Sequence, residues 1–303
     1  MSDQSAARHS GPVVVGVDGS DTSRLALDWA LAAAAQRGLG LVAVHAWAMP
    51  LPPVAMGAAV PGPSYDAISH GAQDFLDTEV AHARSRSGGV PVEGRLVSGP
   101  PVTAILDVAE TEDASLVVLG SRGLDSFSEL LIGSTGVQVA GHAHCPVVVH
   151  RDHADVPPGP EAGRVVVGVD GSAVSEAALA FAFQEASRRR CGLTVTHGWY
   201  APTVDAIGTP VVLPVPLDEV ASDELRTTAE ALAGWREEYP DVDVRSIVHH
   251  GKASKILIEA SKGAALVAVG SRGRGGFASL LLGSVSHAVL HHAYCPVAIV
   301  RAG

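Results

Sequence analysis

Short apolar runs alternate with longer Ala-rich or amphipathic stretches along this chain. In the first half, the apolar runs predict strands at 11–18, 41–47, 92–98, 116–120 and 146–150. These runs are continuous and do not alternate with polar residues, which is typical of strands buried on both faces. They therefore predict a parallel sheet that is covered by helices.

The stretches between these runs predict four helices, at 23–36, 64–87, 101–111 and 134–142. Asp21 or Ser23 suits the N-cap of the first helix. Pro101 opens the third helix, as proline often does in a first turn. Residues 48–64 hold too many prolines for a helix or a strand, so a long loop is expected there.

Almost every element occurs twice. The octapeptide VVVGVDGS at 13–20 returns at 165–172, an offset of 152 (165 − 13). The stretch LVVLGSRG at 116–123 returns as LVAVGSRG at 266–273, an offset of 150 (266 − 116). Such matches predict a duplicated domain of common size. We expect a first domain at 1–151, a Pro- and Gly-rich linker at 152–163 and a second domain at 164–303.

Polar and Gly-rich residues follow the first and fourth strands of each copy. The first strand ends in Asp18-Gly19-Ser20 and the fourth in Gly120-Ser121-Arg122-Gly123. The same Asp-Gly-Ser and Gly-Ser-Arg-Gly sequences recur in the second copy. Alternating strands and helices indicate a doubly wound α/β fold. Ligands of such folds bind beyond the carboxyl ends of the strands, at the switch point in strand order. The sequence therefore predicts one ligand site in each domain.

One frame extends this pattern: Gly-Ser-Arg-Gly, nine residues, then Gly-Ser, at 120–134 and again at 270–284. Glycines let backbone amides approach a ligand closely, and a helix N-terminus with free amides binds anions. The frame suits a phosphate chain, with the aspartate nearby to accept from an amine or a ribose hydroxyl. A single copy could serve only as a turn, but the duplicated spacing favours binding.

The frame G-x-x-G, nine residues, G-[ST], after an Asp-ended first strand, resembles the signature of ATP-binding universal stress proteins, and the resemblance covers nearly the whole chain. It implies two tandem Rossmann-like (adenine nucleotide alpha hydrolase-like) α/β domains, each a five-stranded parallel sheet of order 3-2-1-4-5. It also implies ATP at the crevice between strands 1 and 4, with Mg²⁺ as an optional companion of the phosphates. The implied function is a nucleotide-dependent regulator of stress response or growth in a bacterium.

The resemblance also assigns residues. Asp18 and Asp170 would contact the adenine end, Ala46 and Gly198 would line the base pocket, and the frames would wrap ribose and phosphates. The implied binding residues of the first domain are Gly16, Asp18, Ala46, Gly120, Arg122, Gly123, Gly133, Ser134 and Thr135. Those of the second domain are Gly168, Asp170, Gly198, Gly270, Arg272, Gly273, Gly283, Ser284, Val285 and Ser286.

The two frames differ in two respects. The second continues as Gly-Ser-Val-Ser, whereas the first reads Gly-Ser-Thr-Gly, so that a hydroxyl is missing at Gly136 and Thr135 is its nearest substitute. The first nine-residue spacer carries Asp125 and Glu129, which are unfavourable near phosphates, whereas the second is RGGFASLLL. We expect both domains to bind ATP, the second more tightly.

The net charge and composition of the chain limit the classes of partner and the cell compartment that can be expected. The formal charge of −11 argues against nucleic acid, since phosphate backbones need a basic footprint. The polar N-terminus shows no signal pattern and no run suits a membrane span. The three cysteines do not form a disulfide framework, so a cytoplasmic location is expected. The protein partner stays open, and so does a homodimer beyond an intramolecular pseudo-dimer of the two domains.

Other chemistries find little support. There is no G-x-x-x-x-G-K-[ST] loop, no G-x-G-x-x-G after a first strand and no Cys/His set with metal spacing. His45 and His197 suit packing at strand ends, and Cys145 and Cys295 suit small buried side chains better than redox sensors. No nucleophile and base pair up in both copies, so no catalytic residue is assigned.

Binding without turnover is therefore expected. Two alternatives stay open. One is a slow ATPase or autophosphorylating enzyme, with Ser134, Thr135, Ser284 or Ser286 as acceptors. The other is a nucleotide-free scaffold built as a pseudo-dimer.

Overall fold

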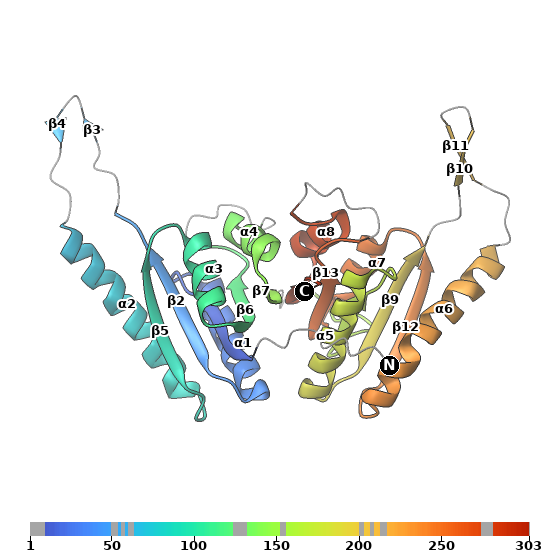
Figure 1. Cartoon of the computed structure of the whole chain (residues 1–303), viewed down its shortest axis with the longest axis horizontal. Coiled ribbons are helices and arrows are strands. Elements are labelled where there is room, and N and C mark those ends of the chain that lie inside the picture. Colours follow the sequence, from blue (N-terminus) through green and yellow to red (C-terminus); the bar gives the residue numbers. More distant parts are fainter. Residues whose placement is uncertain are drawn as a thin grey trace. The chain divides into compact units, whose positions relative to one another are not determined.

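The computed structural model divides into two compact units, Met1–His150 and Arg151–Gly303. It describes residues 10–49, 54–55, 58–59, 64–123, 132–151, 156–199, 203–206, 209–212, 217–273 and 281–302. Each unit is an α/β sandwich around its own parallel strands (Figure 1). The predicted fold class is confirmed, and each unit is described below by itself.

The first unit contains a five-stranded parallel sheet. Its strands are β1 (Gly11–Gly16), β2 (Leu41–Trp47), β5 (Val92–Ser98), β6 (Ala114–Gly120) and β7 (Val147–His150). They pair in the order β5-β2-β1-β6-β7, which is 3-2-1-4-5 within the unit. In the register of the central strand, Val13 lies between Leu41 and Leu116. The strand order therefore reverses between β1 and β6, where a ligand crevice is expected.

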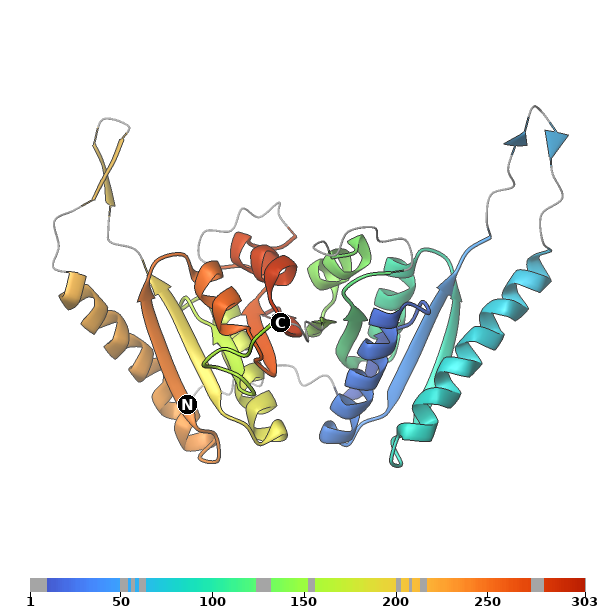
Figure 2. The ribbon, with the colours of Figure 1, turned by 180° about the vertical axis from the view of Figure 1, so that it is seen from behind.

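Within the described residues of this unit, four helices cover the sheet. They are α1 (Asp21–Arg37), α2 (Tyr65–Arg86), α3 (Pro101–Thr111) and α4 (Ser134–His142). Helices α1 and α2 pack on one face and α3 and α4 on the other (Figure 1, Figure 2). Ala26, Ala30 and Ala34 of α1 are fully buried, because their small side chains let the helix lie close to the valines of β1.

The second unit repeats the first. Its strands are β8 (Val165–Gly168), β9 (Leu193–Trp199), β12 (Val244–His250), β13 (Leu266–Gly270) and β14 (Val297–Val300), paired in the order β12-β9-β8-β13-β14. Its helices are α5 (Ala173–Arg189), α6 (Leu217–Glu238), α7 (Ala253–Ala260) and α8 (Ser284–His292). Its strand order reverses between β8 and β13.

The long connection after the second strand of each unit departs from the prediction. Instead of a loop without elements, it carries a short antiparallel pair: β3 (Val54–Ala55) with β4 (Ala58–Ala59), and β10 (Thr203–Ala206) with β11 (Thr209–Val212). Pro210 sits inside β11, opposite Asp205. A two-stranded ribbon has two free edges, so a proline that donates no ladder hydrogen bond is tolerated there.

The N-cap of α1 also differs from the prediction. It is Ser20, whose side chain accepts from the Ser23 amide, while Asp21 is the first helical residue. The hydroxyl of Ser23 instead donates to the Ser20 carbonyl at 3.0 Å. Ser172 and Ser175 repeat this pattern at α5. The caps therefore fix the turn that joins the first strand of each unit to its first helix.

The end of the predicted linker is attached to the second unit. Residues 156–163 contain no helix or strand. Gly159 and Gly163 donate from their amides to the carbonyls of Lys262 and Gly263, at 2.9 and 2.8 Å. Glu161 is buried at 7% exposure and accepts from the hydroxyl of Thr194. This segment is therefore held by specific contacts despite its lack of regular structure.

Candidate functional site

Each unit has a cavity at the carboxyl ends of its first and fourth strands, where the strand order reverses. In the first unit the cavity has a volume of about 130 Å³ and is bounded by β1, β6 and the start of α4. In the second unit the corresponding cavity has a volume of about 820 Å³. Ligand cavities typically measure about 300–1,000 Å³, and of these two the second lies within that range.

Most residues singled out from the sequence line these cavities. In the first unit they are Gly16, Asp18, Ala46, Gly120, Arg122, Gly123, Gly133 and Thr135. Ser134 is exposed and does not line the cavity. In the second unit all ten line it: Gly168, Asp170, Gly198, Gly270, Arg272, Gly273, Gly283, Ser284, Val285 and Ser286. The fold thus gathers residues from both ends of each domain's sequence.

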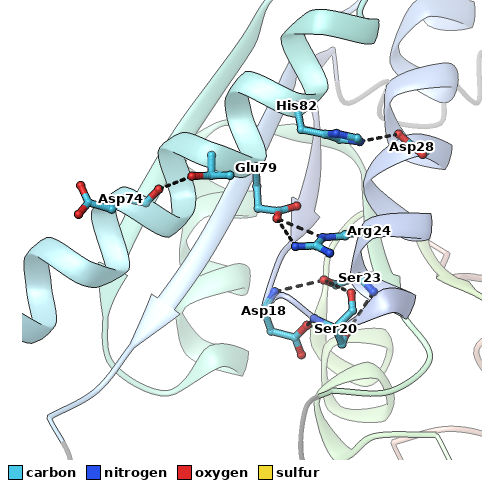
Figure 3. A network of polar contacts seen from close by, with 9 residues as sticks. Asp18, Ser20, Ser23, Arg24, Asp28, Asp74, Glu79 and His82 are labelled. Carbon is cyan, nitrogen blue, oxygen red and sulfur yellow. Dashed lines mark hydrogen bonds and ion pairs between the residues drawn. The ribbon is translucent and has the colours of Figure 1, made fainter.

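The aspartate after the first strand is held by its own turn. The Oδ1 atom of Asp18 accepts from the Ser20 amide at 2.9 Å and from the Ser20 hydroxyl at 2.6 Å (Figure 3). The turn has a φ of +87° at Gly19, a backbone conformation that residues with a side chain rarely adopt. Glycine is therefore suited to this position. Asp170 makes the same two bonds to Ser172, at 3.0 and 2.6 Å. Each carboxylate therefore holds its turn through the Oδ1 atom.

The two ends of the frame are joined by one backbone hydrogen bond. The amide of Gly133 donates to the carbonyl of Ser121 at 2.9 Å, and Gly283 donates to Ser271 at 2.8 Å. This bond closes the nine-residue spacer, which explains why both copies keep the same spacing. Neither Gly133 nor Gly283 caps its helix with a side chain. The helix N-termini therefore keep the partial positive charge that attracts anions.

The cavity walls differ in size at three equivalent positions. Where the first unit has Ala46, Pro101 and Leu119, the second has Gly198, Ala253 and Val269. At each position the first unit carries the bulkier side chain. These three side chains narrow the first cavity, whereas the second cavity also extends to His197, Trp199 and Glu224. We did not predict this difference from the sequence.

The strand-end histidines pack differently in the two units. The rings of His45 and Phe75 pack at a tilt of 58°, with their centroids 4.6 Å apart. His197 instead faces the Glu224 carboxylate, with Nε2 and Oε2 separated by 3.0 Å, and Glu224 lines the second cavity. The Nδ1 atom of each histidine faces a backbone carbonyl at 2.8 Å. Both ring nitrogens of His197 therefore face oxygen atoms, one of the backbone and one of Glu224.

Glu224 was missed in the sequence, because nothing in a helical stretch marks which acid faces a cavity. Its counterpart in the first unit is Ala72, at an offset of 152 (224 − 72), which does not line that cavity. Among the described residues, the second site thus has an acidic group without a counterpart in the first. The spacer acids Asp125 and Glu129 lie outside the described residues, so their effect stays a prediction.

A polar network beside the first site holds helices rather than ligand. The guanidinium of Arg24 reaches the nearly buried Glu79 at 3.3 Å, and His82 lies 3.6 Å from Asp28 (Figure 3). These pairs connect α1 with α2. None of the four residues lines the cavity.

In the described ranges, no group of three or more His, Cys, Asp or Glu side chains is arranged so that it could hold a metal ion. In the same ranges no helix is long and apolar enough to cross a membrane.

The cysteines are expected to be unequal in reactivity. Burial raises the pKa of Cys145 and of Cys295 to about 12, whereas Cys191 is only half-buried. At pH 8 a thiol with that pKa is about one ten-thousandth thiolate, and the thiolate is the nucleophile. Iodoacetamide should therefore label Cys191 first in the native chain, and the other two only after unfolding. Peptide mass spectrometry of a labelling time course measures this, and equal rates at all three would contradict it.

Taken together, the fold and the two cavities define a tandem doubly wound α/β protein with a duplicated ligand site at its switch points. The sequence model of the universal stress protein family (Usp) matches residues 10–151 and 161–301. The chain belongs to the universal stress protein family.

Curated relatives share this two-domain length. The chain is 37% identical over 303 residues to the universal stress protein Rv2623 of Mycobacterium tuberculosis H37Rv, covering 98% of each chain. It is 38% identical to the universal stress protein Mb2028c of Mycobacterium bovis, covering 98% of this chain and 99% of that one. The crystal structure of a universal stress protein from Archaeoglobus fulgidus matches with a TM-score of 0.67, 21% identity and 97% coverage of each chain, which supports the fold.

Proposed function

We propose that this protein is a nucleotide-dependent regulator that binds ATP, principally in its second domain. The observation that carries the proposal is the cavity of about 820 Å³, which all ten residues expected from the sequence line. Its size lies within the range of sites for molecules as large as a nucleotide. The family resemblance in the sequence supplies ATP as the ligand and stress response or growth as the process.

The residues present fit such a ligand. The free N-terminus of α8, with Gly273 and the cation of Arg272 beside it, suits the phosphates. Asp170 lines the cavity and would accept from a base amine or a ribose hydroxyl, and Gly198 leaves room for the base. Mg²⁺ would depend on the phosphate oxygens for its ligands, because the described residues offer no carboxylate cluster.

The first domain is proposed as a weaker site for the same ligand. Its cavity has the same loop, the same helix start and the same aspartate, but a volume of only about 130 Å³. A base would have to displace the bulkier wall at Pro101 and Leu119. We place the protein in the bacterial cytoplasm, where ATP is present and its cysteines stay reduced. Binding without turnover is the proposed mode.

The test begins with the full-length protein as purified. Denaturation and chromatography identify any nucleotide that is released, and calorimetry of the stripped protein measures its rebinding. We expect adenine nucleotide, with two classes of site that differ at least about tenfold in affinity. Two equal sites would overturn the ranking of the domains. No nucleotide on purification and none binding on addition would overturn the proposal.

A further inference from the structure

We propose that Thr22 is a positioning residue of the first site, and that Ser286 performs the equivalent task in the second site from a different helix. Each holds one peptide plane of the Gly-rich loop that follows the fourth strand of its unit. This inference rests on the proposed function, since it concerns how these loops present amides to phosphate.

In the first unit the anchor comes from α1. The Thr22 hydroxyl donates to the Arg122 carbonyl at 2.6 Å, across 100 residues of sequence. The hydroxyl of Ser20 also faces this carbonyl, at 3.3 Å. The loop can lie this close because Gly120 has no side chain: a Cβ there would stand 2.8 Å from the Thr22 carbonyl.

In the second unit the same bond cannot form. The counterpart of Thr22 is Val174, at an offset of 152 (174 − 22), which has no hydroxyl. Instead, Ser286 of α8 donates to the Ser271 carbonyl at 2.9 Å and is 2% exposed. The counterpart of Ser286 is Gly136, at an offset of 150 (286 − 136), so the first unit lacks that anchor in turn. Each unit thus has the hydroxyl that the other lacks.

The two anchors act on successive peptides of the loop. The carbonyl and the following N–H of a trans peptide point in opposite directions, and the described residues contain no cis peptide. Holding the Arg122 carbonyl therefore directs the Gly123 amide to the opposite side. Holding the Ser271 carbonyl directs the Arg272 amide. The carbonyls of Ser121 and Ser271 already accept from the amides of Gly133 and Gly283. Ser286 therefore adds a second bond to a peptide that is held in both units, whereas Thr22 fixes the next peptide, at Gly123, which lines the first cavity.

Fixed amide donors matter most for the charged part of a ligand. Amides that are oriented before binding need no reorganisation when an anion arrives. A loop without its anchor keeps its fold but must order itself on binding. The anchors should therefore affect phosphate-bearing ligands and leave a nucleoside without phosphate almost unaffected.

The first arm of the test replaces Thr22 by valine in full-length protein whose second site carries Gly273→Ala. We expect ATP to bind the first site about fivefold to tenfold more weakly, as for the loss of one hydrogen bond. Adenosine affinity should change less than twofold. Thr22→Ser, which keeps the hydroxyl, is the matched control and should retain the affinity for ATP. Equal weakening for ATP and adenosine, or none for ATP, would overturn the role.

The second arm moves the anchor of one unit into the other. Ser286→Gly should weaken ATP at the second site, and adding Val174→Thr should restore at least half of the lost binding free energy. Amide hydrogen exchange of the ligand-free chain gives an independent reading. Thr22→Val should speed exchange at Gly123, and an unchanged rate would overturn the anchor itself. If the unmodified protein binds no nucleotide, the proposed function fails, and this exchange result still decides whether the anchor exists.

Discussion

Gly273→Ala is expected to weaken nucleotide binding at the second site at least about tenfold. A Cβ at this position would lie in hard contact with the Oδ2 atom of Asp170. That carboxylate cannot simply turn away, because its other oxygen holds the amide and hydroxyl of Ser172. Gly273 does not have a positive φ, so the cost comes from this contact and not from backbone strain.

Calorimetric titration of the full chain with ATP measures the effect. Gly234→Ala is the control in the same unit, since a Cβ there meets nothing within 4 Å. A double-mutant cycle tests the cause. Asp170→Ala alone should also weaken the site, and Gly273→Ala should then cost little more. Fully additive losses would show that the glycine acts otherwise, and full retention of binding in both single variants would remove the site assignment.

The elements were largely predictable because their bounds follow local chemistry. The apolar run 41–47 became β2 and the Pro-opened stretch 101–111 became α3 with the expected bounds. The cap of α1 was wrong because three neighbouring residues, Ser20, Asp21 and Ser23, can all cap a helix. Only the backbone angles of the turn select one of them, here Ser20 in an extended conformation. The hairpins were missed because proline content was treated as excluding strands, which holds for central strands only.

The candidate site was predictable where duplication marked it. The frame and the Asp-Gly-Ser turn recur at constant offsets, and the fold brings them to one cavity in each unit. The missing hydroxyl at Gly136 was visible, but Thr135 was proposed as its substitute. Thr135 lines the first cavity, and the hydroxyl that donates to the Arg122 carbonyl of the loop is that of Thr22. Sequence alone does not show which hydroxyl reaches which carbonyl across a fold, although the Thr22/Val174 difference was a signal.

Arg164→Ala is expected to destabilise the second unit by about 3–5 kcal/mol. The guanidinium is buried and donates from Nε to Thr194 at 2.9 Å and from Nη1 to Asp243 at 2.7 Å. Its Nη2 atom donates to the carbonyls of Leu193 and Asp243, at 2.8 and 2.7 Å. Removing it would leave Glu161 buried without its nearby cation, 3.6 Å away. The segment 156–163 would lose the positive charge that lies beside its Glu161 carboxylate.

Urea unfolding measures the loss in a chain with Trp29 and Trp47 replaced by phenylalanine, so that Trp199 and Trp235 report the second unit. Arg245→Ala is the matched control: it lies 3.7 Å from the same Asp243 but is exposed, and should cost less than about 1 kcal/mol. An Arg164→Ala loss no larger than the control's would contradict the prediction.

In the first unit, the positions that correspond to Arg164, Thr194 and Asp243 carry no charged side chain. These counterparts are Pro12, Val42 and Pro91, at an offset of 152 (164 − 12). Transplanting these three residues together with Glu161→Ala should therefore recover most of the stability that Arg164→Ala loses, because no buried charge is left unpaired.

The ion pair of Arg164 and Asp243 makes the stability of the second unit depend on pH. Hydrogen bonding to Arg164 lowers the pKa of Asp243, so its stabilising effect is present above the pKa of the unfolded carboxyl and fades as pH falls through the folded value. The variant with the three transplanted residues and Glu161→Ala should lack this contribution to the loss of stability at low pH. An identical acid transition in both chains would show that the ion pair of Arg164 and Asp243 does not contribute to it.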